Sequence, residues 1–193
     1  VEADQSEITE KDNYLITGNV KIRSNVHYLS ADKVLISIKD QASKASGNVK
    51  YQDNNFFLTG DELNLKKDND DLIVEISNAR YQEIQTKASG SSKFVRKTPN
   101  NAFLEESTYS FCPINDNQWF IKAKKINLDL KNNRAIASNA SLVFYGVPIF
   151  YLPRYSWVTQ GRGSGFLTPS FNIYKESGLE SSDWLIRAPY YIN

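Results

Sequence analysis

Apolar residues alternate with polar ones along several short stretches of the chain. The clearest runs lie at 34–38, 63–65, 72–76 and 126–130, where every second residue is Val, Ile or Leu. A period of two is typical of β-strands with one buried face. Turn-forming residues separate the runs, as in "KKDNDD" at 66–71 and "LKNNR" at 130–134. No window of a dozen residues keeps a helical period, so the pattern predicts an almost entirely β chain.

One short phrase recurs along the chain. "GNVKI" at 18–22 returns as "GNVKY" at 47–51, and fainter copies follow as "SNARY" at 77–81 and "SNASLVF" at 138–144. Gly or Asn at this landmark predicts a bend or bulge between strands. Units of this length bury their apolar faces by stacking, which predicts a jelly-roll-like sandwich of repeats. The pattern leaves open whether the interior is filled by its own side chains or is open to a ligand.

The charge balance removes one class of partner. The 193 residues carry 23 Lys and Arg against 22 Asp and Glu, a net charge of +1, so we expect no nucleic-acid partner. No apolar run approaches the roughly 20 residues of a membrane-spanning helix, and no signal segment opens the chain. The chain lacks methionine, so we expect a processed chain or part of a longer protein.

The residues that could carry chemistry are few. His27, the only histidine, is expected to be an ordinary strand residue, and Asp61 and Glu62 are expected to face water. "GRGSG" at 161–165 has the spacing of neither a nucleophile elbow nor a phosphate loop and predicts a hinge. Cys112 is the only cysteine, which excludes an internal disulfide and a thiolate zinc site. We expect no catalytic residue, metal or cofactor.

Three longer motifs mark the second half of the chain. They are "TYSFCP" with a later Trp at 108–119, "VPIFYLPRY" at 147–155 and "SGFLTPSF" at 164–171. The repeats at 14–81 resemble the OstA-like group, which includes the bridge proteins LptA and LptC. With these motifs added, nearly the whole chain resembles the outer-membrane lipopolysaccharide-assembly family LptD.

The resemblance implies a fold, a location and partners. Residues 1–160 would form a periplasmic OstA-like β-jellyroll, and residues 161–193 a hinge and the first hairpin of a transmembrane β-barrel. The function implied is lipopolysaccharide transport and assembly at the outer membrane, from the periplasmic bridge to a lateral gate of the barrel. Implied partners are lipopolysaccharide, LptA docking edge to edge, LptE in the barrel of the full-length protein, and the outer membrane itself.

The leading hypothesis is therefore a lipid conduit with an apolar interior. Burying acyl chains contributes about 0.8 kcal/mol per CH₂. The residues expected to line the groove are Val34, Ile36, Ile38, Val49, Tyr51, Leu63, Leu65, Val74, Ile76, Ile126, Leu128, Leu130, Leu142 and Phe144.

The alternative is a secreted β-helix carbohydrate-active enzyme, with charged residues clustered on adjacent rungs at one register. Lys21 and Lys50, and likewise Asp32 and Asp61, occupy matching positions of the repeat. Such residues also suit solvent-facing turns.

Cys112 and two prolines complete the candidate residues. The resemblance implies a disulfide between Cys112 and a cysteine near the far end of the barrel, outside this chain; a small buried residue is the alternative. Pro169 and Pro189 lie in predicted strands, where proline cannot donate to the ladder. The resemblance places them at the lateral gate, where weakened pairing would let lipid leave; a tolerated edge or bulge is the alternative.

Overall fold

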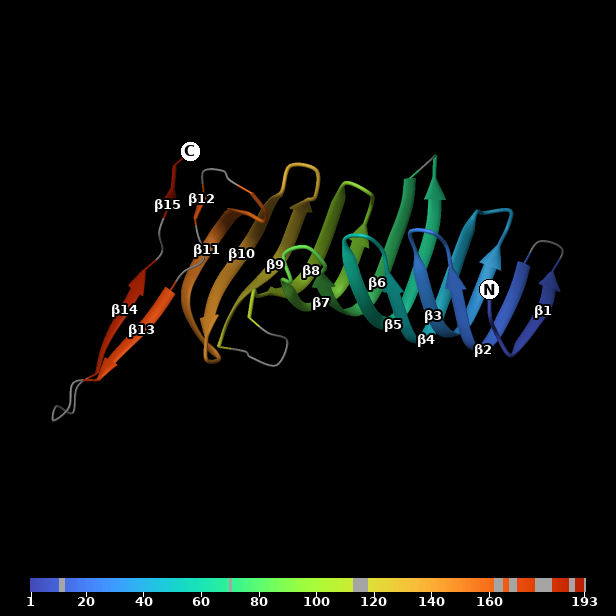
Figure 1. Cartoon of the computed structure of the whole chain (residues 1–193), viewed down its shortest axis with the longest axis horizontal. Helices are drawn as coiled ribbons and strands as arrows, with labels where there is room; N and C mark the ends of the chain where they lie inside the picture. The colour runs from blue at the N-terminus through green and yellow to red at the C-terminus, as the bar shows by residue number, and fades with distance from the viewer. Residues whose placement is uncertain are drawn as a thin grey trace.

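The computed structural model describes residues 1–10, 13–69, 71–112, 118–161, 165–166, 170–175, 182–187 and 190–192. Eleven strands form one sheet in which every strand pairs antiparallel with its neighbours in the sequence (Figure 1). This confirms the prediction of an all-β jellyroll of stacked repeats. The described residues include no helix that is both long and apolar enough to cross a membrane. The strands are β1 (Gln5–Glu10), β2 (Asn13–Arg23), β3 (Tyr28–Ser37), β4 (Ala42–Gln52), β5 (Phe56–Asp68), β6 (Asp71–Glu83), β7 (Ser89–Lys97), β8 (Asn101–Tyr109), β9 (Trp119–Asp129), β10 (Arg134–Phe144) and β11 (Val147–Val158).

Every second strand from β2 to β10 bends in its middle at a residue with left-handed backbone. Asparagine is one of the few non-glycine residues that adopt this conformation readily. The ladders shift register beside the bends, for example between Thr17 and Val20 and between Ser46 and Val49. The repeat seen in the sequence is therefore a pair of strands with one bend. These corner residues are Asn19 (φ 43°), Asn48 (φ 47°), Asn78 (φ 49°), Glu106 (φ 49°) and Asn139 (φ 49°).

Aspartate side chains tie the first three corners to a neighbouring segment. Asn48 Nδ2 donates to Asp32 Oδ2 at 2.8 Å, and Asn78 Nδ2 donates to Asp61 Oδ2 at 2.7 Å. The first corner repeats the arrangement, since Asn19 Nδ2 donates to an oxygen of Asp4 at 3.3 Å. The aspartates that recur in the repeat are therefore exposed residues that fix the corners.

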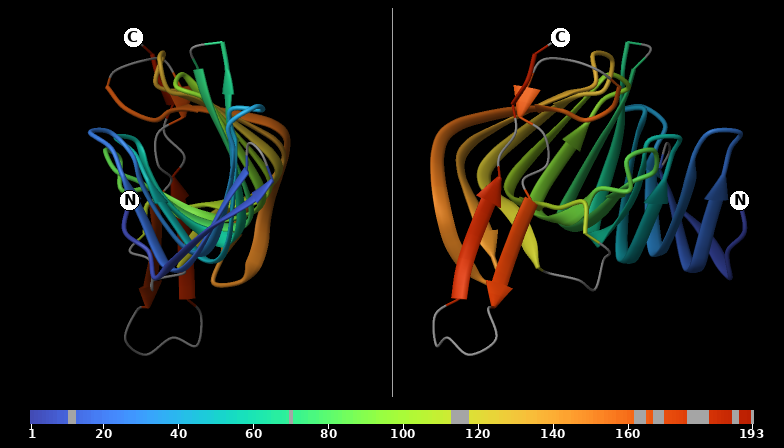
Figure 2. Two further views of the ribbon diagram at one scale, coloured as in Figure 1. Left: turned by 90° about the vertical axis from the view of Figure 1, so that its right-hand side faces the viewer. Right: turned by 60° about the vertical axis from the view of Figure 1, so that its left-hand side comes forward.

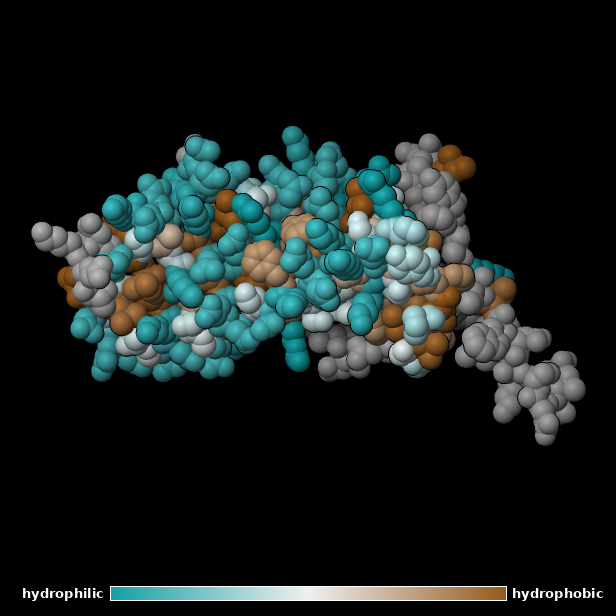
Figure 3. Space-filling model, turned by 180° about the vertical axis from the view of Figure 1, so that it is seen from behind, coloured by the Kyte–Doolittle hydropathy of each residue, from teal (hydrophilic) through white to brown (hydrophobic). Residues whose placement is uncertain are grey.

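The corners divide the sheet into two walls that face one another across a shared interior (Figure 2). The first wall contains Tyr51, Leu58 and Tyr81, and the second contains Leu63 and Val95. All belong to one buried apolar cluster that extends from β2 to β11. Most of the outer surface seen in Figure 3 is hydrophilic, with hydrophobic side chains in a band along its middle and near both ends. We call this rolled sheet the roll.

Four short strands follow the roll. β13 (Ser170–Lys175) pairs antiparallel with β14 (Ser182–Arg187), and β12 (Gly165–Phe166) pairs with β15 (Tyr190–Tyr191). Their place in a transmembrane barrel and the domain boundary at residue 160 stay predictions. Pro169 and Pro189 lie outside the described residues, so their role stays a prediction as well.

Gly90 provides a test of the close packing between strands. It pairs with Tyr81, and a Cβ atom added to it would overlap the carbonyl oxygen of Thr108. We expect Gly90→Ala to lower the free energy of unfolding by about 2–3 kcal/mol, because backbone would have to move. Gly146 is the control, since it has a φ of +82° and nothing within 4 Å of an added Cβ.

Gly146→Ala should lower the free energy of unfolding by only about 1 kcal/mol, which is the strain of placing alanine in left-handed backbone. Urea denaturation of the two purified variants measures the difference. Equal losses would show that the Gly90 contact can relax freely.

Candidate functional site

The structure brings most of the predicted groove residues into one interior. Ile36, Leu65, Leu130 and Leu142 are partly buried and pack against the buried cluster. Ile38 lies outside it, 56% exposed in the turn after β3, and Phe144 packs instead on Tyr145 with 4.7 Å between ring centroids. Whether any of them contacts lipid stays a prediction. The residues inside the cluster itself are Val34, Val49, Tyr51, Leu63, Val74, Ile76, Ile126 and Leu128.

Side chains fill the interior where β5, β6, β7 and β8 face one another across it. A small hollow lies between the walls and is bounded by both of them, but it has no room for a water molecule. Its lining is apolar except for Lys97 and the hydroxyl of Tyr81. An acyl chain can occupy this part of the interior only if side chains or walls move apart. The lining residues are Phe56, Leu58, Tyr81, Val95, Lys97, Ala102 and Leu104.

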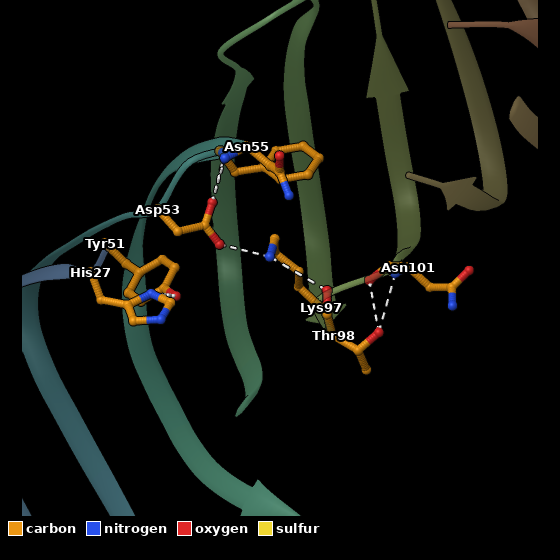
Figure 4. Close-up of polar contacts among 8 residues, drawn as sticks. His27, Tyr51, Asp53, Asn55, Lys97, Thr98 and Asn101 are labelled. Carbon is orange, nitrogen blue, oxygen red and sulfur yellow. Dashed lines mark hydrogen bonds and ion pairs between the residues drawn. The ribbon is translucent and has the colours of Figure 1, made fainter. Parts of the chain in front are cut away.

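A buried ion pair closes one side of the roll next to this hollow. Lys97 Nζ lies 2.6 Å from Asp53 Oδ2, and the two side chains are only 7% and 6% exposed (Figure 4). Asp53 lies in the turn after β4 on the first wall, and Lys97 ends β7 on the second wall. We call the side where these turns meet the mouth, and the ion pair the clasp. The clasp therefore joins two walls that no backbone ladder connects at this point.

The two halves of the clasp are held unequally. Asp53 Oδ1 accepts the backbone N–H groups of Asn55 and Phe56, each at 2.8 Å, so its carboxylate is part of the turn. The Lys97 ammonium makes a further hydrogen bond, to the carbonyl oxygen of Thr98 at 3.4 Å. Because the ammonium sits on a flexible four-carbon stem, Lys97 is the half that can move.

Two further polar contacts lie along the interior on either side of the clasp. Tyr51 Oη lies 2.9 Å from Nδ1 of His27, and the two rings stack. Burial, followed by the nearby charge of Asp53, raises the pKa of Tyr51. His27 precedes β3 and is not within a strand, a small departure from the expected position.

The second contact centres on Glu83. Its Oε2 accepts from Thr86 Oγ1 at 2.6 Å and from Tyr109 Oη at 3.4 Å. Burial raises the pKa of Glu83, and these hydrogen bonds offset part of the effect. The Tyr109 ring also lies 5.1 Å from that of Trp157, which belongs to the opposite wall. Neutral rings thus join the walls near β11, and charges join them at the clasp.

The side chains that join the walls were not predicted from the sequence. "DNN" at 53–55 is a turn signal that could have placed Asp53 at a strand end. Nothing local marks Lys97 as its partner, because the contact depends on how the walls fold together. Cys112 is half-buried, with its N–H bonded to Ser110 Oγ at 3.0 Å, and its pairing outside this chain stays a prediction.

No group of three or more potential metal ligands occurs within the part of the chain that the structure describes. The geometry defines a β-jellyroll scaffold with an apolar interior, in which, among the described residues, the outer strands β1 and β11 each pair on one side only. The chain belongs to the family described as "LptA/(LptD N-terminal domain) LPS transport protein", whose sequence profile matches residues 1–134.

Relatives named LPS-assembly protein LptD align along the whole chain. The protein from Nitrosococcus oceani is 33% identical over 197 residues, covering 100% of this chain and 26% of the relative. That from Aeromonas hydrophila is 30% identical, covering 100% of this chain and 24% of the relative. The chain thus spans about a quarter of the length of these relatives.

One solved structure is LptH, "the LptA homologous periplasmic component of the conserved lipopolysaccharide transport device from Pseudomonas aeruginosa". It is 18% identical, covers 83% of this chain and 94% of its own, and superposes with a TM-score of 0.31.

The clasp predicts a specific order of stabilities. Lys97→Ala should lower the free energy of unfolding by about 3–5 kcal/mol, because it leaves the Asp53 charge buried without a partner. The double variant Lys97→Met with Asp53→Asn should have a free energy of unfolding within about 1 kcal/mol of that of the unmodified protein, because neither charge remains. Chemical denaturation of the purified variants measures both.

The exposed Lys44–Glu62 pair, 3.1 Å apart with side chains 53% and 52% exposed, is the matched control. Lys44→Ala should cost less than about 1 kcal/mol. If Lys97→Ala costs no more than Lys44→Ala, the clasp does not join the walls.

Glu83 predicts a pH-dependent stability. Because its folded pKa lies above the ordinary value of 4.5, the folded state binds the proton more tightly than the unfolded chain. This contribution is complete below the unfolded pKa and is lost as pH rises through the folded pKa. Glu83→Gln removes the titration and should raise the melting temperature by about 2 °C or more at pH 8.

The gain should shrink as the pH approaches 4.5, the ordinary value of the glutamate pKa. Thermal unfolding at several pH values measures it, with the exposed Glu62→Gln as control. A gain that is independent of pH would show that burial of the charge is not its cause.

Proposed function

We propose that this chain transports lipopolysaccharide at the outer membrane, its interior receiving acyl chains from a periplasmic bridge. One observation carries the proposal: a single buried apolar cluster continues from Ile16 in β2 to Trp157 in β11, along the whole roll. Membership of a family described by LPS transport supports the same function. Acyl chains would gain about 0.8 kcal/mol per CH₂ on leaving water for such an interior.

The ends of the roll suit partners that dock edge to edge. Within the described residues, β1 and β11 each pair on one side only, which leaves an unpaired edge at each end of the sheet. An unpaired edge can accept a strand of another protein through backbone hydrogen bonds. Glu7 on β1 is exposed, and such edge charges discourage nonspecific pairing. We propose that an LptA-type bridge protein docks on the β1 edge.

The location and the remaining partners rest on the family. We propose that residues 1–160 lie in the periplasm and that the protein is attached to the outer membrane. LptE as a partner and the lateral gate at Pro169 and Pro189 belong to the same proposal.

The alternative of a β-helix enzyme has less support. A β-helix requires parallel strands, whereas every ladder of the sheet is antiparallel. Asp32 and Asp61, which the enzyme hypothesis needed for proton transfer, accept hydrogen bonds from the corner asparagines instead. We therefore do not propose a catalytic function.

Photo-crosslinking in cells tests the conduit. A photoreactive amino acid placed at Val34, Leu63 or Ile126, all fully buried, should form adducts with lipopolysaccharide. The same amino acid at Lys66 or Asn132, which are exposed near turns, should form few or none. Immunoblotting of the adducts gives the measurement. Equal labelling at buried and exposed positions would contradict an interior route.

A further inference from the structure

The clasp lies across the path that the polar part of a transported lipid would take. An amphiphile in the roll buries its acyl chains between the walls, but its sugars and charges cannot enter an apolar interior without a large desolvation cost. The head must therefore project through the mouth while the chains remain inside. Along the mouth, the Asp53–Lys97 pair joins the two walls at 2.6 Å. No lipid head can pass between two groups in direct contact.

We propose that the clasp is a gate within the conduit, which opens to let each lipid head move from the β1 side of the roll to the β11 side. The proposal rests on the proposed transport function, and the ligand is an amphiphile with several acyl chains and a large polar head. Lys97 is also one of the residues that line the hollow beside the clasp.

The gate opens by movement of Lys97, because the Asp53 carboxylate is held more firmly than the Lys97 ammonium. Two backbone N–H groups hold the Asp53 carboxylate in its turn, whereas the Lys97 ammonium has Asp53 and, at 3.4 Å, the carbonyl oxygen of Thr98 as its partners. Rotation of the Lys97 stem moves its ammonium into water or beside an anionic group of the passing head, with no rearrangement of the turn. Water or the lipid then replaces the carboxylate as the partner of the ammonium, which keeps the cost of opening low.

The other two side-chain contacts near the mouth cannot open in the same way. His27 and Tyr51 both belong to the segments around β3 and β4 of the first wall, so their contact does not span the mouth. Tyr109 and Trp157 do join the walls, but through the packing of neutral rings, with no charge that could exchange one ionic partner for another. Among the described residues, the clasp is the ion pair that joins the walls.

A covalent lock tests the gate. The full-length protein would carry Asp53→Cys and Lys97→Cys, with a photoreactive amino acid at Val34 on the β1 side or at Ile126 on the β11 side. A bis-maleimide with a short flexible spacer then ties the two cysteines together. We expect adducts with lipopolysaccharide at Ile126 to fall about tenfold after locking, because a closed gate stops passage. Adducts at Val34 should persist, because they form before the gate.

The matched control locks an exposed pair of the same wall. Lys44→Cys with Glu62→Cys joins β4 to β5, which remain neighbours whether or not the mouth opens. This crosslink should leave the amount of adduct at Val34 and at Ile126 within about twofold of the amount before crosslinking, because β4 and β5 do not move apart when the mouth opens. Cys112 is present in both proteins, so its reaction with the reagent cancels in the comparison. Each protein is also compared with itself before the reagent is added, which separates locking from any effect of the substitutions on folding.

The outcomes separate the gate from the conduit. Loss of adducts at Ile126 alone, and only with the clasp locked, supports the gate. Unchanged adducts at Ile126 in the locked protein overturn it while leaving the transport function standing. Absence of adducts at both positions before locking overturns the transport function and the gate together.

Discussion

The left-handed residue in the middle of every second strand is the constraint on which the rest of the structure depends. An antiparallel sheet of eleven strands with one apolar face cannot remain flat in water, because that face would be exposed. A bend at Asn19, Asn48, Asn78, Glu106 and Asn139 folds the sheet along one line, so that its two halves cover each other. The buried cluster, the two walls and the mouth all follow from this line of corners.

Apolar contacts and ion pairs between the walls differ in what they lose when the walls separate. Apolar contacts between the walls lose their stabilisation when water enters, and they recover nothing from it. Charges behave differently, because Asp53 and Lys97 regain hydration when they part. A buried ion pair is therefore a costly way to hold two walls together but a suitable way to hold walls that must part repeatedly. The polar clasp beside an otherwise apolar hollow fits a roll that opens at this point.

The sequence predicts those features that depend on neighbours along the chain. Alternation predicted the strands. The recurring Gly-Asn and Ser-Asn phrases predicted bends at Asn48 and Asn78, because asparagine adopts left-handed backbone readily. The bends were expected between strands, but they lie in the middle of β4 and β6. The corner at Glu106 was missed because glutamate rarely adopts left-handed backbone and gives no signal. Lys97 was missed for another reason. Its partner lies on the opposite wall, and only the folded path of the strands between them brings the two side chains together.

A folded open sheet suits the proposed transport along its length better than a closed barrel of similar size. Within each wall, ladders of backbone hydrogen bonds fix the strands to their neighbours, so the walls keep their shape. Between the walls, side chains make the contacts. Widening the roll therefore separates side chains and flexes the corners, and the ladders stay intact. A closed barrel would have to break a ladder of backbone bonds to open by the same amount, and each broken bond leaves groups to be satisfied elsewhere. Because the corners confine the motion to one line, the interior can adapt to a bulky group of acyl chains while the edges at β1 and β11 keep their backbone groups in register for a neighbouring strand.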